Sequence, residues 1–327
     1  MTREVQILEI ISRCFPQTSA EIIVGIGDDA AITQIHGVAL VSASDLAVEG
    51  VHFKREWSTP WEIGARVCAA NCADIYAMGA KPHHLLVSMV IPSDMSLAEI
   101  EGVARGISDE AREAGAVVVG GDISAGASLI ISIAAFGYPI NENLSQPRFL
   151  RSGARAGETI VISSLTGRSR LGYEILVSGR RDLIEKFPQF VSQYKKPLIN
   201  YTFAEGVALA PVGAGIDISD GLLSELGHIA SASGVDVELN PGWWQSFPKW
   251  PEFKQACDEL GVNAEELILT GGEDHSFVIT TGFPAIVGGV PIGTIVTRAQ
   301  SENDESGFAI TLGEKRYTVN STLGYQH

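Results

Sequence analysis

Basic residues are scarce in this chain. Its 327 residues include 23 Lys and Arg against 39 Asp and Glu, so the formal net charge is -16 at pH 7. This excess of negative charge repels the phosphate backbone of nucleic acids and the surface of anionic membranes. We therefore expect neither as a partner. A phosphorylated ligand would have to bring its own cations.

Long apolar runs are also absent. No stretch approaches the ~20 residues of a membrane span, and the opening MTREVQILEI lacks the apolar core of a signal peptide. We therefore expect a cytoplasmic protein. The few cysteines form neither a zinc pattern nor a C-x-x-C redox pair. Cys68 and Cys72 lie four residues apart in a predicted helix and are expected to be reduced packing residues. Neither has a basic neighbour in sequence that would activate it as a nucleophile.

The usual ATP-binding signatures are missing as well. The chain has no G-x-x-x-x-G-K-[ST] loop and none of the protein-kinase motifs V-A-I-K, H-R-D or D-F-G. If the protein uses ATP, metal ions and carboxylates must hold the phosphates in place of a lysine cradle.

Strand-like apolar runs alternate with helix-like stretches along the whole chain. The runs VALVSAS, HLLVSMVI, AVVVGG and ETIVISS are examples of the strands, and the segments 59–79, 96–115, 198–210 and 222–233 have helical patterns. This order predicts an α/β (α+β) protein. The polar segment NENLSQPRFLRSGARAGE is the best boundary and divides the chain into two domains, residues 1–140 and 150–327.

A glycine turn near the N-terminus carries two adjacent carboxylates. In EIIVGIGDDAAI, Asp28 and Asp29 follow a strand-like run. The pattern fits the G-x-G-x-x-G/A turn of a dinucleotide site, but two carboxylates there would repel a pyrophosphate. They could instead cap a following helix, or hold a cation beside a phosphate. The motif alone does not decide among these.

The helix predicted from Thr59 places a carboxylate on its apolar face. Thr59 and Glu62 form a capping box with Pro60 at the first helical position. Asp74 continues the face begun by Ile63 and Val67. A buried carboxylate needs a partner, which could be an arginine, a helix end or a cation.

Further aspartates lie at the ends of other apolar runs rather than on charged helix faces. With Asp28, Asp29 and Asp74 they make seven carboxylates, which could share one site only with polyvalent cations because like charges raise each other's pKa. A site for several Mg²⁺ ions and nucleotide phosphates is the resulting hypothesis. The additional residues are Asp45, Asp122, Asp217 and Asp220.

Eight segments, in order, resemble the thiamine-monophosphate kinase family of the aminoimidazole ribonucleotide synthetase-like (PurM-like) group. They are GIGDDAA, SDLAVEGVHF, NCADIYAMGAKP, GGDIS, LRSGARAGE, IDISDGL, GGED and LGYQH. The resemblance implies a two-domain fold, with the N-terminal domain binding ATP and Mg²⁺ and forming a β-barrel across a homodimer. It also implies direct, in-line transfer of the γ-phosphoryl group of ATP to thiamine monophosphate, without a covalent nucleophile.

The resemblance also assigns roles to individual residues. ATP would contact Gly121, Arg151 and Ser219, and thiamine monophosphate would contact His52, Glu273 and Tyr325. Taken by themselves, His52 could be structural, Arg151 a surface charge and Tyr325 an apolar anchor. The implied Mg²⁺ ligands are Asp28, Asp29, Ser44, Asp45, Asp74, Asp122, Asp217 and Asp220.

One departure from the family pattern concerns the acceptor. After Gly-Gly-Glu-Asp the family usually continues Tyr-Glu, and this chain has His275 and Ser276. A sister enzyme with another acceptor, or an ATP-binding dimer without turnover, are the alternatives. Selenophosphate synthesis is disfavoured because the segment before GIGDD has no cysteine or lysine in the glycine-rich setting that this chemistry uses. A hydrogenase-maturation role is disfavoured because the chain has no C-terminal cysteine.

Overall fold

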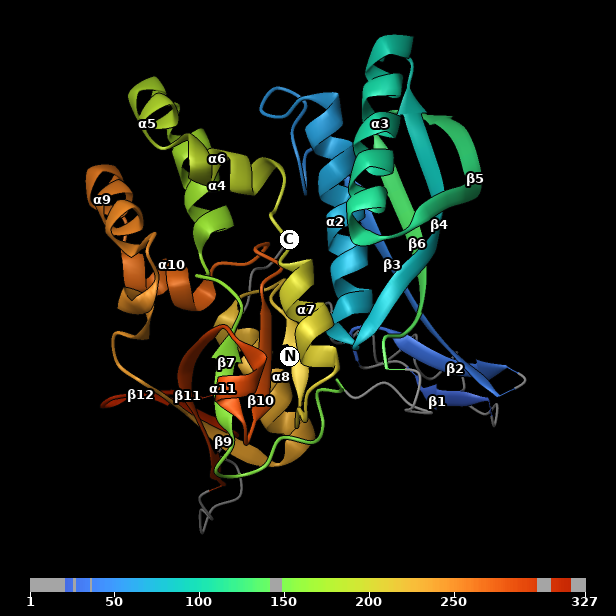
Figure 1. Ribbon diagram of the computed structural model, residues 1–327. Helices are drawn as coiled ribbons and strands as arrows, with labels where there is room; N and C mark the ends of the chain where they lie inside the picture. Colours follow the sequence, from blue (N-terminus) through green and yellow to red (C-terminus); the bar gives the residue numbers. More distant parts are fainter. Residues whose placement is uncertain (1–20, 26–27, 36, 142–148, 299–306, 319–327) are drawn as a thin grey trace.

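The computed structural model consists of two β-sheets with helices packed on them (Figure 1). It describes residues 21–25, 28–35, 37–141, 149–298 and 307–318. Cys14 and Tyr325 lie outside these ranges. None of the helices in the described ranges is long and apolar enough to cross a membrane.

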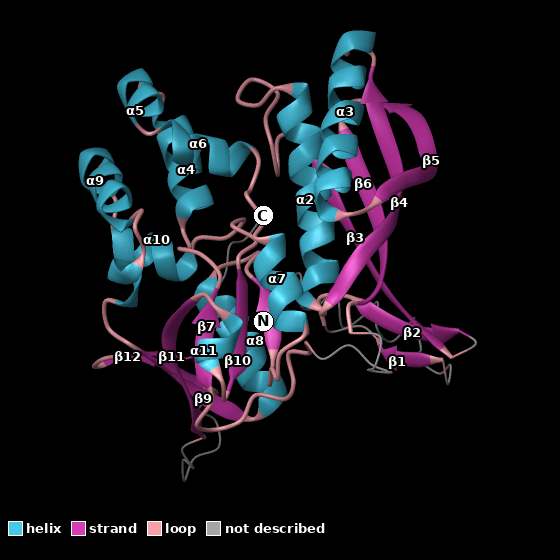
Figure 2. Cartoon of the chain, in the orientation of Figure 1, coloured by secondary structure: helices cyan, strands magenta, loops and turns pink. Residues whose placement is uncertain are grey.

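The first sheet comes from the N-terminal half and has the strand order β1-β2-β3-β6-β4-β5. All its neighbours are antiparallel except β4 and β5. Helices α2 and α3 lie side by side on it, and β5 forms its outer edge (Figures 1 and 2). The elements are β1 (Ile22–Val24), β2 (Ala31–Ile35), β3 (Val38–Val48), α2 (Pro60–Ala77), β4 (Ala80–Pro92), α3 (Leu97–Ala114), β5 (Val117–Gly126) and β6 (Ile130–Pro139).

Both helices of this half begin with a capping box. Thr59 and Glu62 cap α2, as predicted, and Ser96 and Glu99 cap α3 in the same way. The two helices approach closely where a glycine of α3 faces α2. A Cβ at Gly106 would lie 2.0 Å from the carbonyl oxygen of Trp61. This contact fixes the position of α2, the helix that carries Asp74.

The second sheet comes from the C-terminal half and has the order β13-β12-β9-β11-β7-β10-β8. Its strand β8 lies at one edge and contacts α2 of the first half. The strands are β7 (Thr159–Ile162), β8 (Gly215–Asp217), β9 (Val235–Leu239), β10 (Phe277–Thr281), β11 (Val290–Thr297), β12 (Ala309–Leu312) and β13 (Lys315–Thr318). The helices are α4 (Arg168–Ser178), α5 (Arg181–Lys186), α6 (Pro188–Lys195), α7 (Tyr201–Ala208), α8 (Leu222–Ser233), η1 (Trp243–Ser246), α9 (Trp250–Leu260), α10 (Ala264–Thr270) and α11 (Pro284–Val287).

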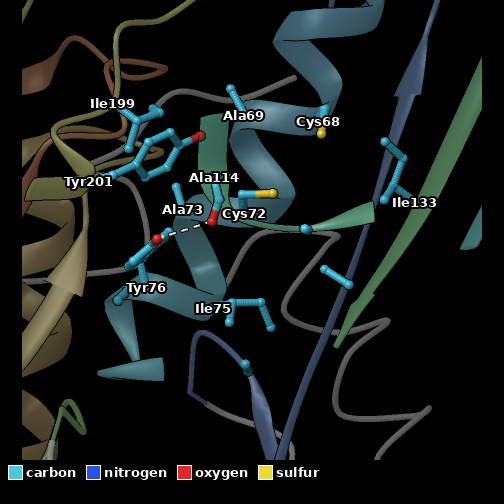
Figure 3. Close-up of a cluster of buried hydrophobic side chains, with 14 of the residues drawn as sticks. Cys68, Ala69, Cys72, Ala73, Ile75, Tyr76, Ala114, Ile133, Ile199 and Tyr201 are labelled. Atoms are coloured by element: carbon cyan, nitrogen blue, oxygen red, sulfur yellow. Dashed lines mark hydrogen bonds between the residues drawn. The ribbon is translucent and has the colours of Figure 1, made fainter. Parts of the chain in front are cut away.

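Helix α2 joins the two halves through a common apolar core. Figure 3 shows Cys68, Cys72 and Tyr76 of α2 close to Tyr201 of α7, with the Tyr76 hydroxyl donating to the Ala114 carbonyl at 3.1 Å. The Tyr76 and Tyr201 rings lie 4.9 Å apart. Both cysteines are free and fully buried, which confirms that they are packing residues.

Several predictions about local structure were wrong. Of the alternatives left open for Asp28 and Asp29, a helix cap and a pyrophosphate site are excluded, because the turn leads into strand β2. Asp45 lies inside β3 and Asp122 inside β5 because both strands are longer than their apolar runs.

Candidate active site

The site begins at an open edge of strand β3. Strand β2 pairs with β3 only as far as Ser42, so within the described part of the chain the backbone of Asp45 has no strand partner on that side. The side chain of Asn71, on α2, fills the position and accepts a hydrogen bond from the Asp45 N–H at 2.9 Å. Asp28 and Asp29 immediately precede β2. The turn before β2 therefore adds two carboxylates, of which Asp29 interacts with Asp74 and Asp217.

Asp74 contributes a fourth carboxylate from α2. Its carboxyl group shares a side-chain hydrogen bond with that of Asp45. Burial raises the pKa of Asp74 well above its usual value, and the nearby charges of Asp45, Asp217 and Asp29 raise it further. Packed protein atoms also raise the pKa of Asp45. Ionising both carboxyl groups is thus unfavourable unless a cation is present.

The C-terminal half adds further carboxylates through β8 and the turn that follows. The Asp217 N–H donates to Asp29 Oδ2 at 3.4 Å, which links the two halves directly. Asp220 follows in the turn before α8, and its N–H donates to Glu225 Oε1 at 3.1 Å. Glu225 is buried, and burial raises its pKa well above the usual value, with Asp217 and Asp220 adding to the effect.

Arg151 balances part of this charge. Its Nη2 lies 2.6 Å from Asp29 Oδ1, and its backbone N–H donates to Asp28 Oδ2 at 3.3 Å. Even so, burial raises the pKa of Asp29 to about 7, because Arg151 offsets only part of the effects of desolvation and of neighbouring carboxylates. The pKa of Asp28 is also raised by burial.

A second cation comes from the loop between α10 and β10. His275 is buried, and its Nδ1 lies 2.8 Å from Asp217 Oδ2. Burial alone would lower the pKa of His275, but the hydrogen bond to Asp217 and the nearby carboxylate of Glu273 outweigh it and raise the pKa to about 10. His275 therefore carries a positive charge at neutral pH. In the same loop, Glu273 Oε2 lies 2.8 Å from Nη2 of Arg66, a buried residue of α2.

A cleft of about 240 Å³ lies beside these groups and is lined by Asp45, Asn71, Arg66, Asp220, Glu273 and His275. A narrower pocket continues from it, and the two share His52, Arg66 and Glu273. His52 Nδ1 accepts from the Val48 N–H at 3.0 Å, so in the neutral ring the proton is on Nε2 and can be donated to a ligand. Tyr173 and Tyr194 line the narrower pocket. One end of the site is thus acidic and the other aromatic.

The structure brings most of the predicted site residues together. Ser219 and Asp220 line the cleft with Asp45, His52 and Glu273, and Arg151 contacts Asp28 and Asp29. Arg66, Asn71 and Glu225 also belong to the site and had not been predicted from sequence. The partners of Arg66 and Asn71 are distant in sequence, and Glu225 lies in a segment with an ordinary helical pattern, so the sequence gives no sign of their roles.

Four predicted residues are not part of this cluster in the described chain. Gly121 and Asp122 lie on β5, whereas Asp45 lies on β3. The register runs from Asp45 to Gly121 through β6 and β4, which is three strand spacings or roughly 14 Å. Ser44 neighbours Asp45 in β3, so its side chain points to the other face of the sheet. Tyr325 lies outside the described residues.

The donor set suits Mg²⁺ in chemical type. Mg²⁺ prefers carboxylate oxygens and usually keeps phosphate and water ligands as well. Burial is the main cause of the raised pKa values of Asp29, Asp45 and Asp74, and a bound cation would favour their ionised forms. Among the residues that the structure describes, no group of three or more His, Cys, Asp or Glu side chains is already arranged to hold a metal ion. Substrate phosphates would have to complete the coordination.

The chain is similar to a known protein family and to solved structures that share its fold. Residues 27–138 match the family described as AIR synthase related protein, N-terminal domain. The structure of AaThiL complexed with AMPPCP and TMP superposes with a TM-score of 0.83 at 26% identity, covering 99% of this chain and 96% of that one. Hydrogenase maturation protein HypE in complex with ATP shares the fold, with a TM-score of 0.66 at 18% identity, covering 98% and 95%. The mixed α/β, PurM-like fold implied by the sequence motifs is confirmed.

Curated relatives narrow the class to one family. Thiamine-monophosphate kinase of Mycobacterium tuberculosis is 35% identical over 84% of this chain and 78% of its own length. The enzyme of that name from Corynebacterium glutamicum is 34% identical over 85% of this chain and 82% of its own length. The chain is an enzyme of the thiamine-monophosphate kinase family.

Proposed function

We propose that the protein transfers the γ-phosphoryl group of ATP directly to the phosphate of thiamine monophosphate. A phosphate oxygen of the acceptor forms a bond to the γ-phosphorus, the bond to the β-phosphate oxygen breaks, and the products are thiamine diphosphate and ADP. The carrying observation is a cluster of aspartates from both halves of the chain, Asp28, Asp29, Asp45, Asp74 and Asp217, beside a cleft that Asp45 and Asp220 line. The similarity to AaThiL complexed with AMPPCP and TMP supports the choice of ligands.

In this proposal the acidic end of the cleft binds the phosphates through Mg²⁺. The ions, when bound, neutralise the charge that keeps two phosphorylated anions apart. Arg151 would meet the ATP phosphates by moving from Asp29, and Ser219 and Gly121 would contact ATP. The proposed Mg²⁺ ligands are Asp28, Asp29, Ser44, Asp45, Asp74, Asp122, Asp217 and Asp220.

The aromatic end of the cleft would bind the acceptor. His52 can donate from Nε2 to the acceptor phosphate, and Glu273 offers a carboxylate to the nitrogen heterocycles. Tyr173 and Tyr194 offer flat, apolar surface beside Glu273. We also propose that Tyr325 contacts the acceptor. Because ATP is supplied inside cells, we expect the reaction to take place in the cytoplasm.

We further propose that the protein is a homodimer, with the first sheets of two copies forming one barrel. Strand β5 is exposed along its whole length, including Val119 (58%) and Ile123 (66%), and a second copy would cover it. Gly121 and Asp122 lie on this strand. In this view residues 1–140 bind ATP and Mg²⁺ and dimerise, and residues 150–327 complete the active site.

The test is product formation. The purified protein is incubated with ATP, Mg²⁺ and thiamine monophosphate, and the products are separated by chromatography. We expect equal amounts of thiamine diphosphate and ADP. Asp74→Asn should lower the rate at least 100-fold, because one metal-binding carboxylate is lost. Asp182→Asn, which removes an exposed carboxylate at the start of α5, should leave the rate unchanged.

Other outcomes distinguish the alternatives. Consumption of ATP only when a different phosphate ester is supplied would show a sister enzyme with another acceptor. Binding of ATP and Mg²⁺ without transfer to any acceptor would show a nucleotide-binding dimer. Either result would overturn the proposed reaction.

A further inference from the structure

The Ser169 hydroxyl is a buried polar group at the acceptor end of the site. Ser169 is the second residue of α4 and is 0% exposed. Within the described part of the chain, its Oγ has no hydrogen-bond partner. Leaving a buried hydroxyl unpaired is unfavourable, and such groups are rare in folded proteins. Because Ser169 lines the narrower pocket, a ligand bound there can supply the missing partner.

The local structure does not use this hydroxyl. A serine within a helix often donates to the carbonyl four residues earlier. For Ser169 that carbonyl belongs to Leu165, which accepts from Arg168 Nε at 2.7 Å. The N-cap residue Gly167 makes no side-chain cap, and the Ser169 N–H donates instead to Asp274 Oδ1 at 3.0 Å. Asp274 thus caps the helix without help from the hydroxyl.

Close backbone contacts fix the start of α4. A Cβ at Gly167, which has φ 79°, would lie 2.4 Å from the Leu267 carbonyl oxygen of α10. A Cβ at Gly172 would lie 2.1 Å from the Phe190 carbonyl oxygen of α6. The helix is therefore packed against α10 at its first turn and against α6 one turn later. Ser169 lies between these two contacts, so it has a defined position at the pocket.

The narrower pocket is the size of one small polar group. It encloses about 20 Å³, enough for one water molecule, and it continues from the cleft of about 240 Å³. Tyr173 lies four residues after Ser169 on the same face of α4 and lines the pocket together with Tyr194. A ring that binds in the cleft can therefore place only a substituent in this pocket, beside the Ser169 hydroxyl.

The charges around the pocket favour a hydrogen-bond donor that carries no negative charge. The two arginines that line it are already paired, Arg66 with Glu273 at 2.8 Å and Arg170 with Glu174 at 2.7 Å. Asp274 is buried at the start of α4, and burial raises its pKa to about 6, so it is largely ionised at neutral pH. This carboxylate would repel a phosphate next to the hydroxyl and attract an amino group.

We propose that Ser169 determines acceptor specificity, because its hydroxyl accepts a hydrogen bond from an amino substituent on the nitrogen heterocycle of the acceptor. The inference rests on the proposed function, in which the acceptor is thiamine monophosphate, whose pyrimidine ring carries an amino group. An aromatic amino group donates hydrogen bonds and accepts poorly, and a serine hydroxyl has two acceptor lone pairs. The pocket thus selects phosphate esters whose ring carries a small donor, and Ser169 takes no part in phosphoryl transfer.

The test compares two acceptors in the wild-type protein and in Ser169→Ala. One acceptor is thiamine monophosphate, and the other is its analogue with hydrogen in place of the amino group. In Ser169→Ala the KM for thiamine monophosphate should rise about fivefold, the effect of losing one neutral hydrogen bond. The KM for the analogue and the KM for ATP should each change less than twofold.

Ser178→Ala is the matched control. It removes a hydroxyl at the other end of the same helix, where Ser178 Oγ donates to the Ile175 carbonyl at 2.7 Å. All three KM values should stay as in the wild-type protein.

The melting temperature separates recognition from a structural role. Without ligand, Ser169→Ala should keep or raise Tm, because the variant removes an unpaired buried group. If the hydroxyl only supports the helix start, for example by donating to Asp274 Oδ2, the variant should have a lower Tm and an unchanged preference between the acceptors. An unchanged preference, whatever the Tm, would overturn the inference while wild-type transfer continues. If the wild-type protein transfers no phosphate to thiamine monophosphate, the proposed function fails and the inference fails with it.

Discussion

The Arg151 guanidinium and the Asp29 carboxylate form an ion pair between the two halves of the chain, with Nη2 2.6 Å from Oδ1. Arg151 precedes β7 of the second sheet, and Asp29 precedes β2 of the first. The Asp29 side chain is only 1% exposed. The contact therefore both joins the two halves at the cleft and supplies positive charge where phosphates would bind.

Replacing Arg151 should raise the KM for ATP more than the KM for the acceptor. Arg151→Ala removes the planar fork that suits phosphate oxygens, and we expect the KM for ATP to rise about tenfold or more. Arg151→Lys keeps the charge without the fork and should give a smaller rise. Arg155→Ala, at an exposed position nearby in sequence, is the matched control and should behave as wild type. Steady-state kinetics would decide, and equal effects of the Arg151 and Arg155 substitutions would contradict the assignment.

The raised pKa of Asp29 predicts a pH-dependent response to Mg²⁺. Its pKa rises from 3.8 to about 7 on folding, so the native state binds more protons between these values. The contribution of Asp29 to stability is therefore complete below pH 3.8 and is lost as the pH rises through about 7. Mg²⁺ favours the ionised form, so the gain in Tm on adding Mg²⁺ should be larger at pH 8 than at pH 5. Asp29→Asn should reduce this difference, whereas an equal gain at both pH values would count against the site.

The exposed strand β5 predicts a dimer that one charge can disrupt. Ile123 is 66% exposed on β5, and Ile123→Lys would place a charge in the proposed interface. Sedimentation should show a dimer for the wild-type protein and a monomer for this variant. Leu97→Lys, at an exposed apolar position on α3, should remain a dimer. A monomeric wild-type protein would refute the barrel across two copies.

Two glycine-to-alanine substitutions should have opposite effects on the free energy of unfolding, because only one of the two glycines lies at the contact between α2 and α3. Gly106→Ala places a Cβ 2.0 Å from the Trp61 carbonyl oxygen, and we expect a loss of roughly 1–3 kcal/mol in the free energy of unfolding. Gly206→Ala, in α7, meets no atom within 4 Å and should gain up to about 1 kcal/mol. Urea denaturation measures both. Similar stability for the two variants would show that α2 can shift to accommodate the methyl group.

The sequence predicted best what depends on local signals. The start of α2 followed from Thr59, Pro60 and Glu62, and the helical spacing placed Asp74 on an inward face. The predicted ends of β3 and β5 were wrong. Polar residues continue both strands because their backbones are hydrogen-bonded to neighbouring strands. The apolar residues before Gly271 have a composition that suits a short strand, yet Ala264–Thr270 is helix α10, capped by Asn263. Short apolar runs alone do not distinguish the two.

The site was partly predictable for a related reason. Its aspartates stood out because they adjoin apolar runs, and the structure brings most of them together. Arg66 and Asn71 have no such signal, since each lies within the largely buried helix α2 and its partner is distant in sequence. The positive charge of His275 also depends on long-range contacts. Its distance to Asp217 and its left-handed backbone are properties of the folded loop.

The most direct test of the central claim follows the phosphoryl group itself. The protein is supplied with ATP labelled in the γ-phosphate, together with Mg²⁺ and thiamine monophosphate, and the label is traced in both products and protein. The account predicts label in the terminal phosphate of thiamine diphosphate, in equal amount to ADP, with none bound to the protein. Label that appears only in inorganic phosphate, or that remains on the protein before reaching the product, would contradict direct transfer to this acceptor.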